Sequence, residues 1–354
     1  MNLAFNLVIE ATDEDRRGLF LTTAGRLGTT VQNVEKDFWV CWTLDALFNG
    51  LKPGGPRLLF KGGTSLSKAF GLISRFSEDI DITVAREDLG QPMEANDLDG
   101  LSGKQRRLRL EAIRRSCRDY IMGSLQGEFA SIAQAVVPDA KFKVEADPDD
   151  ADQQTLLFWY PTVTSAAGDY VRGAVKIEAG AKSAIDPHVA ACVTPFIAHD
   201  VVDIDLKVAN VTTVKPERTF WDKVVILHGL RQWYERRGVL RQQGQRVSRH
   251  YYDLHLLLAD AAAKEWSADR ALALDCARHA SLFFGSPDLG LESAAPGAFT
   301  LVPPMQMREA LSRDYYAMAG MIFGEAPSFD TVLATIDALE QSLNALPVQE
   351  GRLE

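Results

Sequence analysis

The sequence predicts an α+β protein with two parts. In residues 1–210, short apolar or alternating segments lie between helical patterns, which indicates a mixed sheet with flanking helices. Residues 211–354 contain mainly helical patterns, several of them rich in alanine and leucine. The first part contains a glycine turn between two strand-like segments, in residues 60–84, and its other predicted elements are arranged around this stretch. We therefore expect a sheet-containing core lobe followed by a mainly helical C-terminal lobe.

Composition places the chain among globular proteins. Its 354 residues are 46% hydrophobic and 24% charged, and no apolar run approaches the roughly 20 residues of a membrane span. The N-terminal segment lacks the basic region and the cleavage site of a signal peptide. The cysteines are scattered without a CxxC pair, which argues against a zinc site or a disulfide framework: Cys41, Cys117, Cys192 and Cys276. These features predict a cytoplasmic protein with no membrane partner.

Charge is unevenly distributed along the chain. The net charge of −10 is acidic for a protein that binds nucleic acid. Two islands are nevertheless basic: residues 104–118 carry seven basic residues and one acid, and residues 231–249 carry six arginines and one acid. Each island would suit a phosphate backbone, and each would equally suit a solvated helix face. The second island is predicted to be a mobile polar loop.

Two helices are predicted before the glycine turn. Residues 13–27 form the first, with Asp13 as a plausible N-cap, and residues 29–48 form the second. The second helix contains Glu35-Lys36-Asp37 ahead of an aromatic residue, and its apolar face should pack on the sheet. We expect the charged triplet to form salt bridges within the scaffold, with a catalytic role as the alternative.

The stretch 60–84 contains the first candidate site. A buried strand at 58–60 leads into Lys61, Gly62, Gly63, Thr64 and Ser65, and a helix is predicted over 66–73. The free amides and the positive dipole end of a helix that follows a glycine turn suit a phosphate group. Most Gly-Gly turns only reverse the chain, so the turn alone is weak evidence.

A second strand, residues 79–84, carries two acids. Asp79 and Asp81 alternate with isoleucines, so both carboxylates point to the same face. Adjacent carboxylates repel unless a cation lies between them, and Mg²⁺ or Mn²⁺ prefers such oxygen ligands. A phosphate-binding turn beside a two-carboxylate metal site is the arrangement used for phosphoryl or nucleotidyl transfer. The alternative is a solvated strand face.

The same residues carry a resemblance to a known family. Lys61-Gly62-Gly63-Thr64, followed by Arg75-Phe76-Ser77-x-Asp79-Ile80-Asp81, resembles the signature of the AbiEii/AbiGii toxins, a family that includes the MenT toxins. The Glu-Lys-Asp-aromatic helix is a second point of resemblance. The family's Gly-Ser pair is here Gly63-Thr64-Ser65, so either hydroxyl is a candidate phosphate contact.

The resemblance implies both a fold and an activity. The fold is the DNA-polymerase-β-like nucleotidyltransferase fold, and the activity is Mg²⁺-dependent transfer of a nucleoside monophosphate from an NTP with release of pyrophosphate. The implied acceptor is RNA, such as a tRNA, and the implied partner is an antitoxin of the winged-helix type, in a toxin–antitoxin or abortive-infection system. Transfer to a protein or a small molecule, and a non-catalytic nucleotide- or RNA-binding module, stay open as alternatives.

A nucleotidyltransferase of this type needs a third carboxylate on a strand beside the Asp-x-Asp strand. Strands are predicted at 140–146, 154–160 and 170–178, after a loop at 86–103 and a helix over 104–129. Glu178, at the end of the last strand, is our choice, because the family shows a similar Lys-hydrophobic-acid stretch. Asp203 and Asp205 form a second Asp-Ile-Asp, on a predicted edge strand, and are its rivals.

The C-terminal part offers two further site residues. A helix begins at Pro216 and contains Lys223, and another opens at Arg249 and contains Asp253. By resemblance, Lys223 contacts the triphosphate and Asp253 is a supporting acid. An acid that the family often places before Asp253 is replaced here by His250. Three more helices are predicted, at 259–284, 305–323 and 330–346.

The candidate residues fall into three groups. The catalytic group is Asp79, Asp81, Glu178, Lys223 and Asp253. The nucleotide-binding group is Lys61, Gly62, Gly63, Thr64, Ser65, Ser77 and Lys223. The metal-binding group is Asp79, Asp81 and Glu178.

Overall fold

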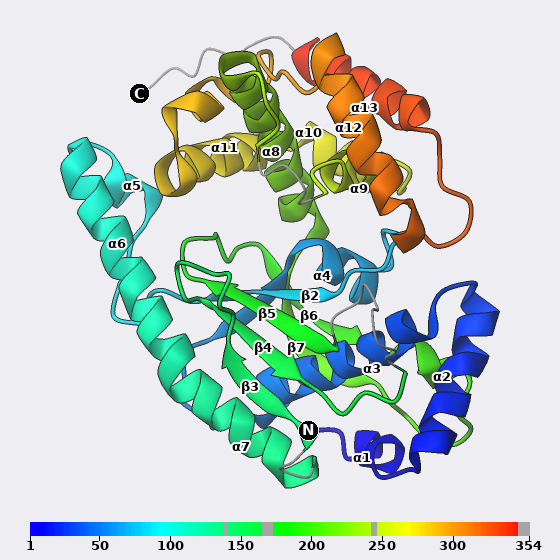
Figure 1. Cartoon of the computed structure of the whole chain (residues 1–354). Coiled ribbons are helices and arrows are strands. Elements are labelled where there is room, and N and C mark those ends of the chain that lie inside the picture. The colour runs from blue at the N-terminus through cyan, green and yellow to red at the C-terminus, as the bar shows by residue number, and fades with distance from the viewer. Residues whose placement is uncertain (138–140, 165–172, 242–245, 346–354) are drawn as a thin grey trace. The chain divides into compact units, whose positions relative to one another are not determined.

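A computed structural model describes residues 1–137, 141–164, 173–241 and 246–345 (Figure 1). The chain divides into two compact units. The first unit comprises Met1–Gly71 and Phe76–Val214, and the second comprises Leu72–Arg75 and Lys215–Glu354. The short segment Leu72–Arg75 therefore packs with the second unit, although it lies between two strands of the first.

The first unit is built on a mixed sheet of seven strands in the order β3-β4-β5-β2-β1-β7-β6. Its pairs β2–β5 and β1–β7 are parallel, and the other neighbours are antiparallel. The strands are β1 Leu58–Lys61, β2 Asp79–Val84, β3 Lys143–Ala146, β4 Thr155–Trp159, β5 Ala174–Gly180, β6 His188–Val193 and β7 Val208–Val214.

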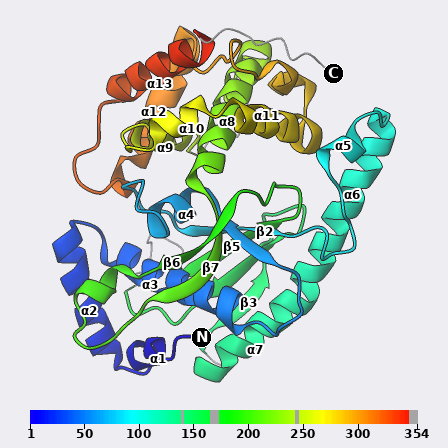
Figure 2. The same cartoon turned by 180° about the vertical axis from the view of Figure 1, so that it is seen from behind.

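The helices of the first unit flank this sheet. They are α1 Ala4–Ile9, α2 Asp13–Leu27, α3 Val31–Asp45, α4 Gly62–Lys68, α5 Ala95–Leu98, α6 Gly103–Tyr120 and α7 Gln126–Val136. A π-helical turn, η2 Ile121–Leu125, joins α6 to α7, and Figure 2 shows the two as one long rod beside the sheet. The mixed sheet with flanking helices confirms the predicted α+β class.

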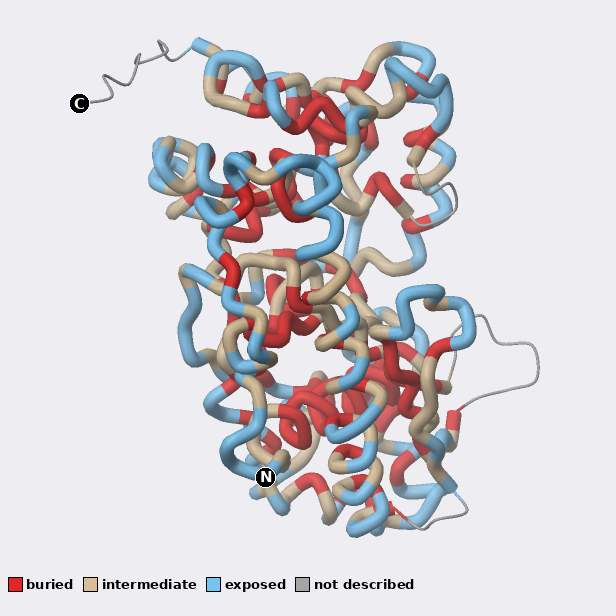
Figure 3. The backbone as a smooth tube through the Cα atoms, turned by 90° about the vertical axis from the view of Figure 1, so that its left-hand side faces the viewer, coloured by how far each residue is buried: buried red, intermediate tan, exposed pale blue. Residues whose placement is uncertain are grey.

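One face of the sheet packs against helices and forms the hydrophobic core of the first unit with them. Phe158 of β4 lies 5.3 Å from Trp42 of α3 and 5.2 Å from Phe129 of α7, measured between ring centroids. Ile80 and Ile82 of β2 are fully buried on the same side. Side chains alternate along a strand, so the charged residues of β2 point to the opposite face. Figure 3 shows the buried core as the red parts of the tube.

The second unit is helical. Its helices are α8 Pro216–Arg237, α9 Arg249–Leu257, α10 Ala263–Ala268, α11 Arg270–Phe284, α12 Met305–Met318 and α13 Phe329–Asn344. The proline stands in the first turn of α8, where its missing N–H needs no helical partner. Within the described residues, no helix combines the length and the apolar character that a membrane crossing requires.

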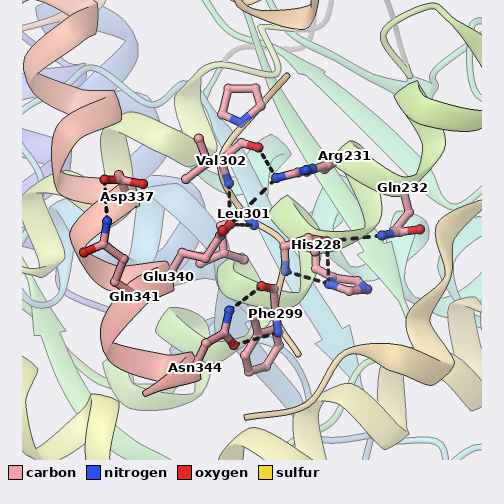
Figure 4. A network of polar contacts seen from close by, with 12 residues as sticks. His228, Arg231, Gln232, Phe299, Leu301, Val302, Asp337, Glu340, Gln341 and Asn344 are labelled. Carbon is pink, nitrogen blue, oxygen red and sulfur yellow. Dashed lines mark hydrogen bonds and ion pairs between the residues drawn. The ribbon is translucent and has the colours of Figure 1, made fainter. Parts of the chain in front are cut away.

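An extended segment, residues 299–302, is held between α8 and α13 by polar contacts (Figure 4). The side chain of Asn344 both accepts from the backbone amide of Phe299 and donates to its carbonyl. Glu340 accepts from the amides of Leu301 and Val302. His228 of α8 accepts from the amide of Thr300 at 3.2 Å. Because these buried backbone groups are satisfied, the segment can lie inside the unit without a strand partner.

Several predicted elements were wrong in their limits. The helix predicted over 66–73 begins at Gly62 and ends at Lys68, and Gly71 beyond it has a left-handed φ of +65°. Thr12, not Asp13, caps α2, because its side chain accepts from the amide of Asp15. The predicted loop at 86–103 contains the short helix α5.

Other differences concern the later part of the chain. The predicted helix 259–284 is broken at Asp269, whose side chain caps α11. Residues 231–237, predicted as a loop, belong to α8. Strands β6 and β7 were not predicted. Residues 140, 170–172, 242–245 and 346 of the predicted elements lie outside the described residues.

Candidate active site

The face of the sheet opposite the core carries three carboxylates on two neighbouring strands. Asp79 and Asp81 belong to β2, and Glu178 belongs to the parallel strand β5. The register pairs Asp81 directly with Glu178. Paired residues of adjacent strands point to the same side, so all three acids project from one face. We call these three residues the acid face.

A lysine that the sequence analysis did not select lies among these acids. Lys176 pairs with Asp79 in the β2–β5 register. Its Nζ lies 2.7 Å from Oε1 of Glu178 and 3.5 Å from Oδ2 of Asp147. The signal was present, because Lys176 alternates with two buried neighbours and therefore points the same way as Glu178. Lys176 supplies the acid face with a cation from the protein itself.

That cation does not neutralise the acid face completely. Burial, together with the neighbouring negative charges of Glu78 and Glu178 and against the opposing effect of Lys36, raises the pKa of Asp79 to about 7. Burial lowers the pKa of Lys176, but the hydrogen bond to Glu178 and the negative charges of Glu178, Asp79 and Asp147 together outweigh this, so the net shift is upward. A half-buried carboxylate in an excess of negative charge favours a further cation.

The donor set fits a hard divalent cation. Asp79, Asp81 and Glu178 offer only carboxylate oxygens, which are the ligands that Mg²⁺ and Mn²⁺ prefer. Within the described ranges, no three His, Cys, Asp or Glu side chains are already gathered closely enough to hold a metal ion. The strands therefore bring the three residues to one face, and closing them around a metal would require side-chain movement.

The glycine turn lies directly against the acid face. Gly62 has a left-handed φ of +81°, and a Cβ at this position would lie 2.9 Å from Cγ of Asp81. Any other residue would be strained and would displace the carboxylate. Asp81 is paired with Glu178 of β5 on one side and with Lys61, at the end of β1, on the other side. Gly62 is thus required where the backbone passes Asp81.

The hydroxyls of the turn make internal contacts. Thr64 is buried, and its hydroxyl contacts the hydroxyl of Ser77 at 2.7 Å and the carbonyl of Asp79. Ser65 is also buried and donates to the carbonyl of Gly62 at 2.9 Å. Ser77 is partly exposed. These contacts tie α4 to the start of β2 and leave Ser77 as the most accessible of the three hydroxyls.

Helix α3 supports the acid face from the other side of the sheet. Lys36 forms an ion pair of 2.7 Å with Glu78, and Asp37 forms one of 2.7 Å with Lys68 of α4. Glu35 accepts from the amides of Val163 and Thr164. The salt-bridging role predicted for this triplet is confirmed, because its lysine and aspartate pair with residues next to the acid face.

The rival acids lie elsewhere in the first unit. Asp203 and Asp205 are exposed, and residues 201–207 form a loop, so the predicted edge strand was wrong. Asp203 has a left-handed φ of +59°, and Asp205 accepts from the amide of Lys207. Neither residue pairs in register with β2, whereas Glu178 does.

The second unit contains a buried charged cluster around Asp253 of α9. Arg75 donates to both carboxylate oxygens of Asp253, at 2.7 Å and 2.9 Å, and Nζ of Lys223 lies 2.8 Å from Oδ2. All three residues are at most 5% exposed. We call them the Asp253 cluster. Burial lowers the pKa of Lys223, and it lowers the pKa of the neighbouring His250 well below the usual range.

Arg75 is another residue that the sequence analysis did not assign to a site. It precedes Ser77 and Asp79 in the signature motif, yet it belongs to the second unit and pairs with a residue 178 positions away. The structure therefore brings the predicted residues together in two groups, one in each unit: the acid face with the glycine turn, and Lys223 with Asp253.

The chain was compared with known proteins. The family model "Nucleotidyl transferase AbiEii toxin, Type IV TA system" matches residues 45–335. Among solved structures, the nucleotidyltransferase toxin MenT4 from Mycobacterium tuberculosis H37Rv is similar, with a TM-score of 0.46 and 16% sequence identity, covering 93% of this chain and 98% of that one. No curated protein sequence matches the chain. Because the family model covers most of the sequence, the protein belongs to the AbiEii family of nucleotidyltransferase toxins.

Proposed function

We propose that this protein transfers a nucleoside monophosphate from an NTP to an RNA acceptor, such as a tRNA, in a reaction that depends on Mg²⁺ or Mn²⁺. The observation that carries this proposal is the acid face, where Asp79 and Asp81 of β2 and Glu178 of β5 share one side of two parallel strands. The adjacent glycine turn and the family membership support it. The RNA acceptor rests on the family resemblance and is the part most in need of a test.

The proposed residues have separate tasks. Asp79, Asp81 and Glu178 would hold a divalent metal, which would neutralise phosphate charge and lower the pKa of the attacking hydroxyl. The turn Gly62–Ser65, with Lys61 and Ser77, would bind phosphate oxygens. The hydroxyl oxygen of the acceptor forms a bond to the α-phosphorus, and the bond from that phosphorus to the β-phosphate oxygen breaks, so pyrophosphate leaves. Glu178 receives the hydroxyl proton.

Lys223 and Asp253 retain the roles that the resemblance implies. Lys223 would contact the triphosphate, and Asp253 would hold the Lys223 ammonium in position, as it does through the 2.8 Å ion pair. Burial lowers the pKa of Lys223, and the Asp253 carboxylate acts in the opposite direction, in favour of the charged ammonium. Asp253 is thus proposed as a positioning residue.

The biological role proposed is that of a toxin neutralised by an antitoxin of the winged-helix type. Membership of a type IV toxin–antitoxin family supports a partner antitoxin. Expression of the protein alone should arrest bacterial growth, and expression of the Asp81→Asn variant should not. Growth arrest that persists in that variant would separate the toxicity from the proposed chemistry.

The biochemical test uses α-labelled NTPs with total bacterial RNA and total protein. We expect label in the RNA fraction, pyrophosphate release, and a loss of at least about 100-fold with Asp81→Asn, because one stabilising group of a transition state contributes on this scale. Retained activity in Asp81→Asn would contradict the site. Label in protein or in a small molecule would contradict the acceptor, and NTP binding without pyrophosphate release would favour a binding module.

A further inference from the structure

Helix α6 carries a row of basic side chains on its exposed side. Of its eighteen residues, seven are basic and two are acidic, in a chain whose net charge is −10. Lys104, Arg107, Arg109 and Arg115 are exposed, and the other three basic residues of the helix are half-buried. We call these four residues the α6 basic face. Lys104 and Arg115 are separated by three helical turns, with Arg107 one turn from Lys104, so these three share one side of the helix and span about 16 Å, and Arg109 is exposed on another side of the helix.

We propose that the α6 basic face docks the RNA acceptor and leads it to the acid face. This inference rests on the proposed function, since it gives the acceptor of that reaction a binding surface. It extends the proposal by naming a surface and residues that neither the family signature nor the acid face contains.

The first argument is the lack of internal partners. Within the part of the chain that the structure describes, no carboxylate lies within ion-pairing distance of any residue of the α6 basic face, although the charge of Arg115 acts on Glu111 from farther away and helps to lower the pKa of that carboxyl. Other arginines of α6 are engaged: Arg114 pairs with Glu111 at 2.6 Å, and Arg118 pairs with Asp119 at 3.1 Å. Cations that the protein does not neutralise are available to an external polyanion.

The second argument is the position of α6 in the first unit. Gln154 precedes β4, and its side chain donates to the carbonyl of Arg114 in the middle of α6, at 3.3 Å. The carbonyl of the same residue accepts from the amide of Ala179, at 3.0 Å. Ala179 directly follows Glu178. Gln154 therefore connects the α6 backbone with the end of β5, which carries Glu178. An RNA strand that lies along α6 would approach the acid face.

The third argument concerns the kind of polyanion. The buried residues of α6 are Ile113 and Cys117, which face the protein, and Leu108 is the large apolar side chain that stands exposed, at 58%. A helix that lies in a membrane surface exposes a broad apolar face, which α6 lacks. A row of separated cations that exposes one large apolar side chain, Leu108, fits a phosphate backbone, and the proposed reaction requires a nucleic-acid acceptor.

The other basic island is a weaker candidate. Arg231 donates to the carbonyl of Val302 and pairs with Glu235 at 2.9 Å, and Arg237 pairs with Asp288. These partners already use the charges of two of the three arginines at the end of α8. The α6 basic face is therefore the better candidate for the RNA-docking surface.

The experiment measures binding of fluorescein-labelled, unfractionated bacterial tRNA to the full chain by anisotropy, in EDTA and at several salt concentrations. The test variant combines Lys104→Gln, Arg107→Gln, Arg109→Gln and Arg115→Gln. The control variant combines Arg17→Gln, Lys52→Gln, Lys141→Gln and Lys207→Gln, which are exposed residues of the same unit outside the proposed site. Both variants change the net charge by the same amount, and thermal melting verifies that both fold.

We expect the test variant to bind tRNA at least about tenfold more weakly near 0.1 M salt, with a salt slope shallower by about 3, because each phosphate contact contributes roughly 0.7 to 0.9. The control variant should keep the wild-type slope. Equal losses in both variants, or no loss in the test variant, would overturn the inference. The inference would also be overturned, in favour of a membrane surface, if the test variant bound tRNA like the wild type but no longer bound phosphatidylglycerol vesicles that the wild type binds.

The Asp81→Asn variant separates this inference from the proposed function. It should lose transfer yet bind tRNA like the wild type. Transfer to RNA that is abolished by Asp81→Asn and unaffected by the four α6 substitutions would leave the proposed function intact and refute the docking surface. An α6-dependent tRNA affinity in a protein that labels no RNA would support the surface and refute the acceptor.

Discussion

The acid face and the Asp253 cluster have opposite balances of negative and positive charge. On the acid face, three carboxylates share two lysines, Lys176 of β5 and Lys61 of β1, which pairs in register with Asp81. In the Asp253 cluster, one carboxylate is held by two cations, Arg75 and Lys223. The first group is short of positive charge, and the second has a surplus of it.

The pKa values of the carboxyl groups in the two clusters differ in the same sense. Burial and neighbouring carboxylates raise the pKa of Asp79 to about 7. Burial alone would also raise the pKa of Asp253, but Arg75 and Lys223 hold it well below its usual range. Burial is therefore common to both, and the neighbouring charges decide the outcome. The acid face is suited to receive a cation, whereas the Asp253 cluster is already a complete ion pair that stabilises its own unit.

The largest expected effect follows from the completeness of the Asp253 cluster. Asp253→Asn leaves two buried cations without their carboxylate, which should lower the free energy of unfolding by about 3–5 kcal/mol. The matched control is Asp288→Asn, which breaks the half-exposed pair with Arg237 and should lower the free energy of unfolding by less than about 1 kcal/mol. Urea unfolding measures both. Equal effects in the two variants would show that the Asp253 cluster does not stabilise its unit.

The second prediction distinguishes the third acid from its rivals. Glu178→Gln should reduce nucleotidyl transfer by about 100-fold, because the amide can neither accept the proton nor offer two anionic oxygens. Asp205→Asn, in the exposed loop, should leave the rate unchanged. The measurement is the initial rate of labelled NMP incorporation. A normal rate in the first variant with a large loss in the second would exchange the two assignments.

The third prediction concerns the pH dependence of stability without metal. The pKa of Asp79 is about 7 in the folded protein and near its ordinary value of 3.8 when unfolded. Between these values the folded state keeps a proton that the unfolded state has lost, so stability from this group falls as the pH rises from about 4 to 7. Asp79→Asn should remove this slope and raise the free energy of unfolding at pH 8 by up to about 4 kcal/mol, which corresponds to the full change in pKa.

Urea unfolding in EDTA between pH 4 and pH 8 tests the third prediction. Asp205→Asn is again the control, since this exposed carboxylate should leave the slope as it is. An Asp79→Asn protein that is less stable than the wild type at pH 8 would mean that the ionised carboxylate has a stabilising partner in the folded state. The contrast with Asp253 would then disappear.

The sequence was informative where the signal is local. The alternation in β2 was enough to place Asp79 and Asp81 on one face, because a strand has a period of two whatever it pairs with. The first residue of α8 was predicted correctly, because Pro216 marks the start of a helix. The salt bridges of Lys36 and Asp37 followed from the position of charges on a helix that had to be buried.

Long-range register could not be predicted from local patterns. Glu178 lies opposite Asp81 only because β5 pairs with β2 in one particular register, and the sequence offered Asp203 and Asp205 as equally regular acids. The pair between Arg75 and Asp253 joins residues 178 positions apart, for which no spacing rule exists. Gly62 was recognised as a turn residue, but its contact with Asp81 depends on how β1 and β2 pair.

The most direct test of the central claim is a calorimetric titration of Mn²⁺ into the protein, without nucleotide. The claim is that the acid face is built to bind a divalent cation. Wild-type protein and Asp205→Asn should then bind Mn²⁺ with the same saturable isotherm, and Asp81→Asn should bind it at least about tenfold more weakly, because a carboxylate ligand becomes a neutral amide. Identical isotherms for the wild type and Asp81→Asn would contradict the claim.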